Sequence, residues 1–410
     1  MKTCSPSGSA GSRLRRAASL SLAILMGGSC AWTAPFVPDN DTQVLERVRI
    51  PSSAFGLREL RGLQTKVARD SKNLTLALEL ANQCVARARA EADPRYLGYA
   101  EAALSHWFGL VQPPASVLVV RATIRQSNHD FVRAMADLDL ALQLDPNNAQ
   151  AWVTRASILL AQGRYAEAKR AFLSLARLTS ELVSVTCASS VASLTGEAGK
   201  SYDVLNRALA RAGSSSREEK LWATTSLAEI AARLGRAAEA EEHFRAALAI
   251  DPNDAYLLGA FADFLLDEAR PVEVLELLGT KMGIDALLLR AALAEQMCGR
   301  EAEAKAHIVT LHERFAATRM RADNVHQREE ARFMLHLLKL PDEAVRLALA
   351  NWQVQREPAD LRILCEAALA TGHPQAIEVA SAWLRRTGLE DARLTGWRAA
   401  VVARLPAPRP

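Results

Sequence analysis

Histidine and cysteine are the residues of this chain that could bind a metal or act as nucleophiles. The chain has eight histidines and six cysteines, and both are scattered along it. His307 and His312 are five residues apart, which would place them on different faces of a helix. His326 and His336 have no acidic or thiol partner at a metal-ligand spacing, and the cysteines form no CxxC pair. The sequence therefore predicts no metal and no cofactor.

Motifs that mark catalytic machinery are also missing. The chain has no phosphate-binding loop, GxSxG elbow, HExxH pair or dinucleotide fingerprint. The charged stretches 217–220 and 328–330 are typical of solvated helix faces. We therefore expect a protein that is not an enzyme. An enzyme built on a helical scaffold is an alternative from another class, although no residue indicates its chemistry.

Residues 1–31 have the pattern of a secretory signal peptide. Three arginines precede a short apolar stretch (17–26), and the small residues of "GGSCA" follow. Because Ser29 and Ala31 are small, we expect cleavage after Ala31. Cys30 leaves an alternative, a lipid-modified cysteine that holds the protein at a membrane. Gly27 disfavours this alternative, because it stands where a lipoprotein signal normally has leucine.

The surplus of positive charge lies in this leader. The chain has 50 basic and 46 acidic residues, and residues 1–31 contain four basic residues and no acidic one. The remaining chain is formally neutral, which, together with export, disfavours nucleic acid as a partner. We expect a periplasmic protein that contacts a membrane only if Cys30 carries lipid. We expect the later cysteines to be solitary buried thiols: Cys84, Cys187, Cys298 and Cys365.

One short pattern occurs three times in the chain. Gly-Arg-x-x-Glu-Ala begins at Gly163, Gly235 and Gly299, and each time an apolar residue follows four positions after the alanine. The copies are about two units of 34 residues apart, and weaker copies lie between them. A period of this length is typical of an array of helical hairpins, in which each hairpin buries its apolar face against the next.

The units resemble the tetratricopeptide repeat family of exported bacterial proteins, most clearly over 115–148, 149–181 and 221–254. Weaker units cover about 182–220, 255–284, 285–318, 325–357 and 358–391, so the resemblance spans roughly two thirds of the chain. A glycine is expected to end the first helix, an alanine to allow close helix crossing, and an aromatic residue to fill the seam. The residues that carry this signature are Trp152, Gly163, Ala168, Phe172, Gly235, Ala240, Phe244, Pro252, Gly299 and Ala304.

The resemblance implies an all-α fold, a right-handed α-solenoid of stacked helical hairpins. We expect five segments along the chain. They are a signal peptide (1–31), a proline-containing lead-in (32–55), an N-terminal helical region with a divergent repeat (56–110), the repeat array (111–391), and a capping helix with a loose tail (392–410).

In the family, the first helix of each hairpin lines a concave groove that binds partners. Transferred to this chain, the groove begins with hydroxyl groups (Thr123, Ser127, Ser157, Thr186 and Ser190). It continues with the acidic and aromatic residues Trp222, Glu229, Tyr256, Asp263 and Asp267. Such a surface suits an extended peptide with basic residues, although Trp222 and Tyr256 could equally serve only in packing. A clamp for C-terminal carboxylates is not expected, because Val153 and Ser157 stand where it needs lysine and asparagine.

The sequence therefore predicts a non-enzymatic scaffold that binds a protein or peptide partner in a periplasmic groove. The alternative is a membrane-tethered assembly factor for envelope polysaccharide, pilus or secretion machinery, which a lipidated Cys30 would support.

Overall fold

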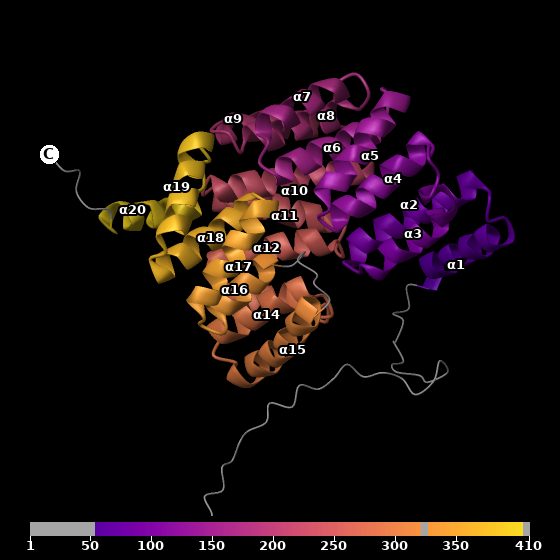
Figure 1. The fold of residues 1–410 in the computed structure, drawn as a ribbon. Coiled ribbons are helices and arrows are strands. Elements are labelled where there is room, and N and C mark those ends of the chain that lie inside the picture. The colour runs from indigo at the N-terminus through magenta and orange to yellow at the C-terminus, as the bar shows by residue number, and fades with distance from the viewer. Residues whose placement is uncertain (1–53, 321–326, 405–410) are drawn as a thin grey trace, which may run out of the picture. The chain divides into compact units, whose positions relative to one another are not determined.

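The structure is a computed structural model that describes residues 54–320 and 327–404. These residues form twenty α-helices and one 3-10 turn, without a strand (Figure 1). The predicted signal peptide, its cleavage site, Cys30 and almost all of the lead-in lie outside the described residues. Within the described ranges, no helix combines the length and the apolar character that crossing a membrane requires.

Most of the helices pack in consecutive antiparallel pairs, so the predicted all-α solenoid of helical hairpins is confirmed. Helix α1 (Ala54–Arg69) precedes the first pair. The pairs are α2 (Leu74–Glu91) with α3 (Arg95–Phe108), α4 (Ala115–Ser127) with α5 (Phe131–Leu144), α6 (Ala149–Ala161) with α7 (Tyr165–Leu175), α8 (Glu181–Ala192) with α9 (Ala198–Arg211), α10 (Arg217–Arg233) with α11 (Ala237–Ile250), α12 (Ala255–Asp267) with α13 (Pro271–Leu278), α14 (Asp285–Met297) with α15 (Glu301–Met320), α16 (Gln327–His336) with α17 (Pro341–Val354), and α18 (Pro358–Thr371) with α19 (Pro374–Thr387). The 3-10 turn Ala392–Leu394 and α20 (Thr395–Arg404) follow the last pair.

The repeated glycines have the conformation that the sequence predicts. Gly163, Gly235 and Gly299 have φ angles of +68°, +73° and +69° at the turns that end α6, α10 and α14. A side chain with a Cβ atom disfavours this left-handed region, so glycine ends these helices without strain. The alanines of the motif, Ala168 and Ala240, are fully buried at the helix crossings. The glycines of the motif therefore end the first helix of a hairpin, and its alanines fill the space between the two helices.

Polar side chains fix where the first helices of the hairpins begin. Asn148 accepts a hydrogen bond from the backbone of α6, and Asp254 does the same for α12. Ser216 and Glu219 form a reciprocal capping box at the start of α10. Such caps satisfy backbone N–H groups that have no partner inside the helix. The turns "DPNN" and "DPND" therefore set the register of each following hairpin.

The cysteines lie within helical packing. Cys84, Cys187 and Cys365 are buried, and Cys298 is half-buried. Burial raises the pKa of the Cys84 thiol, and it raises that of Cys187 to about 12. A buried thiol with a raised pKa carries little of the reactive thiolate form, which fits the structural role that the sequence predicts.

The first helices of successive hairpins lie against one another. Contacts of this kind join α4 to α6, α8 to α10, α12 to α14, and α16 to α18. The first helices therefore line one continuous side of the stack, which we call the concave face. This is the face that the resemblance assigned to partner binding.

The last hairpin also contacts hairpins far earlier in the chain. Trp383 of α19 lies directly over the turn at Gly163, where a Cβ atom would be 2.1 Å from the indole Cη2. The ring also makes an edge contact with Tyr165 at a centroid distance of 5.8 Å. Beside it, the Arg356 backbone N–H donates to the Ala161 carbonyl at 2.7 Å. These contacts join α6 and α7 to the C-terminal helices.

A second set of contacts follows a few residues later. Gly196 and Gly388, both at positive φ, lie against each other, so that a Cβ on Gly196 would be 3.4 Å from the Gly388 carbonyl oxygen. The Glu390 carboxylate accepts a hydrogen bond of 2.7 Å from the Ala198 backbone N–H at the start of α9. The side chain of Glu197, the N-cap residue of α9, makes no such capping hydrogen bond. A carboxylate at a helix N-terminus is favoured by the helix dipole, so Glu390 ties the two regions together.

Candidate partner-binding surface

The hydroxyl residues expected at the start of the groove bind their own helices. Each donates to the carbonyl four residues earlier, and they are Thr123, Ser127, Ser157, Thr186 and Ser190. Such bonds satisfy the hydroxyl hydrogen within the helix. Thr186 is fully buried, so the prediction that it lines the groove is wrong. The other four hydroxyl groups offer a partner mainly acceptor lone pairs.

Trp222 lies at the start of α10 and is half-buried. Its ring packs against the apolar cluster of α6, α7 and α8, which includes Leu159, Phe172 and Val191. The structure thus gives Trp222 a packing role between hairpins, one of the two roles that the sequence allowed.

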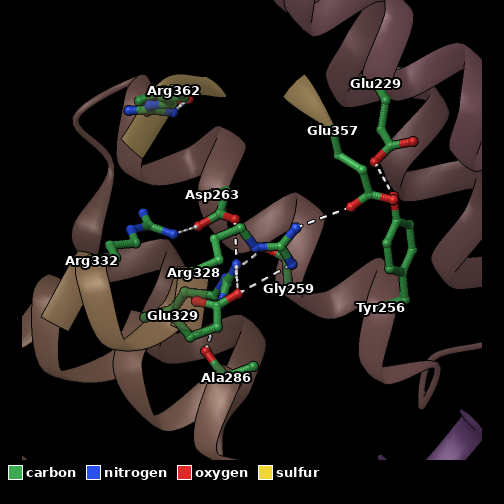
Figure 2. Close-up of polar contacts among 12 residues, drawn as sticks. Glu229, Tyr256, Gly259, Asp263, Ala286, Arg328, Glu329, Arg332, Glu357 and Arg362 are labelled. Carbon is green, nitrogen blue, oxygen red and sulfur yellow. Dashed lines mark hydrogen bonds and ion pairs between the residues drawn. The ribbon is translucent and has the colours of Figure 1, made fainter. Parts of the chain in front are cut away.

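Tyr256 and Glu229 form an accessible polar pair on the concave face. Tyr256, near the start of α12, is 60% exposed, and its hydroxyl donates to the Glu229 carboxylate of α10 at 2.6 Å (Figure 2). The negative charge of Glu229 raises the pKa of the Tyr256 phenol well above its usual value, and Glu357 adds to this effect. Burial among the surrounding helices raises the pKa of the Glu229 carboxyl. This pair combines an exposed aromatic ring with a carboxylate.

Asp263 is already bound by arginines of the chain itself. Arg290 of α14, which is 7% exposed, places Nη2 2.6 Å from the Asp263 carboxylate, and Arg332 of α16 binds its other oxygen (Figure 2). Burial alone would raise the pKa of Asp263, but the two guanidinium groups hold it well below its usual range. Arg290 also reaches Glu329 at 3.3 Å. Asp263 therefore joins three hairpins.

Asp267 is bound in a similar way one turn later on α12. Arg362 of α18 donates to both of its carboxylate oxygens, at 2.6 and 2.7 Å, and Arg393 lies at 3.7 Å. Arg362 also binds Glu366. Burial would raise the pKa of the Glu366 carboxyl, but hydrogen bonding to His336 and the charge of Arg362 lower it to about 2. The acidic residues of α12 therefore hold the C-terminal hairpins against the concave face.

The arginine partners were missed by the sequence analysis. Arg290, Arg328, Arg332 and Arg362 all lie on first helices of later hairpins, on α14, α16 and α18. Applying the groove positions to those later units would have predicted basic residues on the concave face. The sequence would then have indicated that acidic residues of α12 and basic residues of α14, α16 and α18 share the concave face of one chain.

Arg233 is a buried cation without full hydrogen bonding. It is 8% exposed and donates to the Ser193 hydroxyl at 2.9 Å, while its Nε has no hydrogen-bond partner in the described part of the chain. Burial lowers the pKa of the Arg233 guanidinium, and the nearby Arg393 adds to this. Across residues 54–320 and 327–404, no group of three histidine, cysteine or carboxylate residues is placed to hold a metal ion.

Comparison with known proteins identifies the repeats. Family models of the tetratricopeptide repeat match residues 126–179 and 225–254. The chain therefore contains tetratricopeptide repeats, and its hairpins stack as an α-helical solenoid. No curated protein matches the chain in sequence.

Several solved structures are similar in fold. The human IFIT1 dimer with m7Gppp-AAAA is 13% identical, with a TM-score of 0.45 over 86% of this chain and 87% of that one. Yeast Tom70 is 15% identical, with a TM-score of 0.30 over 81% of this chain and 62% of that one. The TPR domain of P58(IPK) is 16% identical, with a TM-score of 0.20 over 75% of this chain and 97% of that one. At these identities the likeness concerns the fold alone.

Proposed function

We propose that this chain is an exported, non-enzymatic scaffold that binds a protein or peptide partner on its concave face. The observation that carries the proposal is the pair of Tyr256 and Glu229, in which the Tyr256 side chain stays exposed to solvent between stacked repeat hairpins. An exposed aromatic ring with an adjacent charge is the type of residue that contributes most to protein interfaces. Asp263 and Asp267 are engaged by the chain's own arginines, so we place the contact at Tyr256.

Site-specific photo-crosslinking tests this proposal. Tyr256 is replaced by a benzophenone amino acid in the full chain, expressed in its native host. We expect a specific protein to be cross-linked, and the cross-link to weaken at least about tenfold with Glu229→Ala, since a contact residue of this kind contributes about 1.4 kcal/mol or more. Val309, 51% exposed on the second helix α15, is the matched control position. The same products at both positions, or none at Tyr256, would contradict the proposal.

Export is a separate part of the proposal and has its own test. If the signal peptide is cleaved after Ala31, the mature chain begins at Trp32, carries no lipid and is released by osmotic shock. Intact-mass measurement of the purified protein checks this directly. An acylated chain that begins at Cys30 would instead support the membrane-tethered assembly factor.

A further inference from the structure

The C-terminal helices share one apolar core with α14 and α15, and Tyr165 and Leu194 also pack against it. One cluster of buried residues extends from α14 to α20, whereas a separate cluster covers α8 to α14. We call residues 327–397, from α16 to the start of α20, the C-terminal body. Helix α14 contributes to both clusters, so it is the element about which the two parts could pivot.

The C-terminal body closes against the earlier hairpins at a few points. At turns and helix ends they are the Trp383 ring over Gly163, the Arg356 backbone bond to Ala161, and the Glu390 carboxylate at the start of α9. Side-chain ion pairs add to them, from Arg332 to Asp263 and from Arg362 to Asp267. All of these contacts can separate without the unfolding of any helix. Interfaces of this kind open at lower free energy than the cores of the parts that they join.

The C-terminal body also supplies charged side chains that lie beside Tyr256. Glu357, the N-cap of α18, lies beside the Tyr256 side chain and binds Arg328 of α16 at 3.1 Å (Figure 2). Arg362 of the body holds Asp267 of α12. Tyr256 is 60% exposed to solvent. Charged side chains of α10, α16 and α18 nevertheless surround its phenol.

Closure also leaves one charged group poorly satisfied. The Arg233 guanidinium lies buried near Asp391 and Arg393 of the body, with its Nε unbonded in the described part of the chain. A buried charge without full compensation raises the free energy of the state in which it is buried. The closed arrangement is therefore less stable, relative to an open one, than its contacts alone would make it.

We propose that the C-terminal body is an intramolecular gate over the concave surface that carries Tyr256. In the closed state, Trp383 and Glu390 hold the body against α6–α9 and a large partner is excluded. In the open state, the body swings about α14 and the partner reaches Tyr256 and Glu229. This gate rests on the proposed function, because it controls whether a partner can reach the surface that the proposed function assigns to partner binding.

Cysteine labelling measures access without any partner. Tyr256→Cys is introduced into the full chain and treated with N-ethylmaleimide or with a bulky polyethylene-glycol maleimide, and labelled peptides are located by mass. We expect the small reagent to react readily and the bulky one slowly. Glu390→Gln should speed the bulky reaction about tenfold, because loss of a charge-assisted hydrogen bond shifts the closed state toward the open one.

Matched variants separate the gate from general loosening. Glu378→Gln, on the preceding helix α19 and 72% exposed in its side chain, should change nothing, and Val309→Cys should react equally with bulky reagent in all backgrounds. Asp267→Asn, which weakens the bond to Arg362, should act like Glu390→Gln. Circular dichroism confirms that each variant is folded.

Either of two results would overturn the gate. One is bulky labelling of Tyr256→Cys as fast as that of Val309→Cys in the otherwise unchanged chain. The other is a labelling rate that neither Glu390→Gln nor Asp267→Asn alters. A failed cross-linking experiment would remove the proposed function and leave the labelling result unaffected.

Discussion

Gly163→Ala is expected to lower the free energy of unfolding by about 3 kcal/mol. Two effects add at this position. The residue has a φ of +68°, which disfavours a Cβ atom, and that atom would lie 2.1 Å from the Trp383 ring. The indole is packed on its other sides by Tyr165 and Trp352, so it has little room to withdraw. Urea denaturation followed by circular dichroism measures the change.

Gly299→Ala provides the matched control for this prediction. Gly299 occupies the same place in its repeat and has a φ of +69°, but a Cβ atom there would meet no atom within 4 Å. Only the backbone term remains, so we expect a loss of about 1 kcal/mol. Equal losses at the two glycines would mean that Trp383 does not close on the Gly163 turn in solution.

Arg290→Met is expected to destabilise the protein by about 3 kcal/mol at neutral pH. The methionine keeps most of the side-chain volume, but Asp263 and Glu329 lose a buried cation, and the Gly259 and Ala286 carbonyls lose a donor. Removing one partner leaves buried charge uncompensated, which is more costly than the loss of an exposed pair. Urea denaturation at several pH values gives the free energies.

The loss should depend on pH in a defined direction. Arginines hold the pKa of Asp263 and of Glu329 below their usual values in the folded protein, against the opposing effect of burial. This contribution to stability is complete above the unfolded pKa values of about 4 and is lost as the pH falls below them. The difference between Arg290→Met and the unchanged protein should therefore shrink in acid.

An exposed ion pair serves as the control. Arg346 binds Glu343 one turn away, and their side chains are 60% and 38% exposed. Arg346→Met should lower the free energy of unfolding by less than about 1 kcal/mol. A similar loss for Arg290→Met and Arg346→Met would show that the buried network does not hold the C-terminal hairpins in place.

The fold could be predicted from sequence because each hairpin repeats the same local solution. The glycine turn at Gly235, the alanine crossing at Ala240 and the aromatic seam at Phe244 recur at a fixed period, and the structure has them in these roles. Helix caps such as Asp254 acted within three residues of their position. Contacts of this range recur in every repeat, so the residues that make them are visible in the sequence as a period.

The concave surface was predicted only in part. The positions of Glu229, Tyr256, Asp263 and Asp267 on α10 and α12 were assigned from the repeat register, but their partners were not. Tyr256 binds a residue of the preceding hairpin, whereas Asp267 binds Arg362 from three hairpins later. The register places a side chain on a face, and the curvature of the whole stack decides which other face it meets.

The sequence by itself therefore determined the helical hairpins, their turns and their stacking order, since these depend on neighbours within about one repeat. Only the tertiary structure decided that Gly163 also accommodates Trp383, that Glu390 caps α9, and that arginines of later hairpins bind the acidic residues of α12. The physical reason is that small rotations between hairpins accumulate along the stack. Their sum brings together residues whose separation in the chain has no period and leaves no pattern in the sequence.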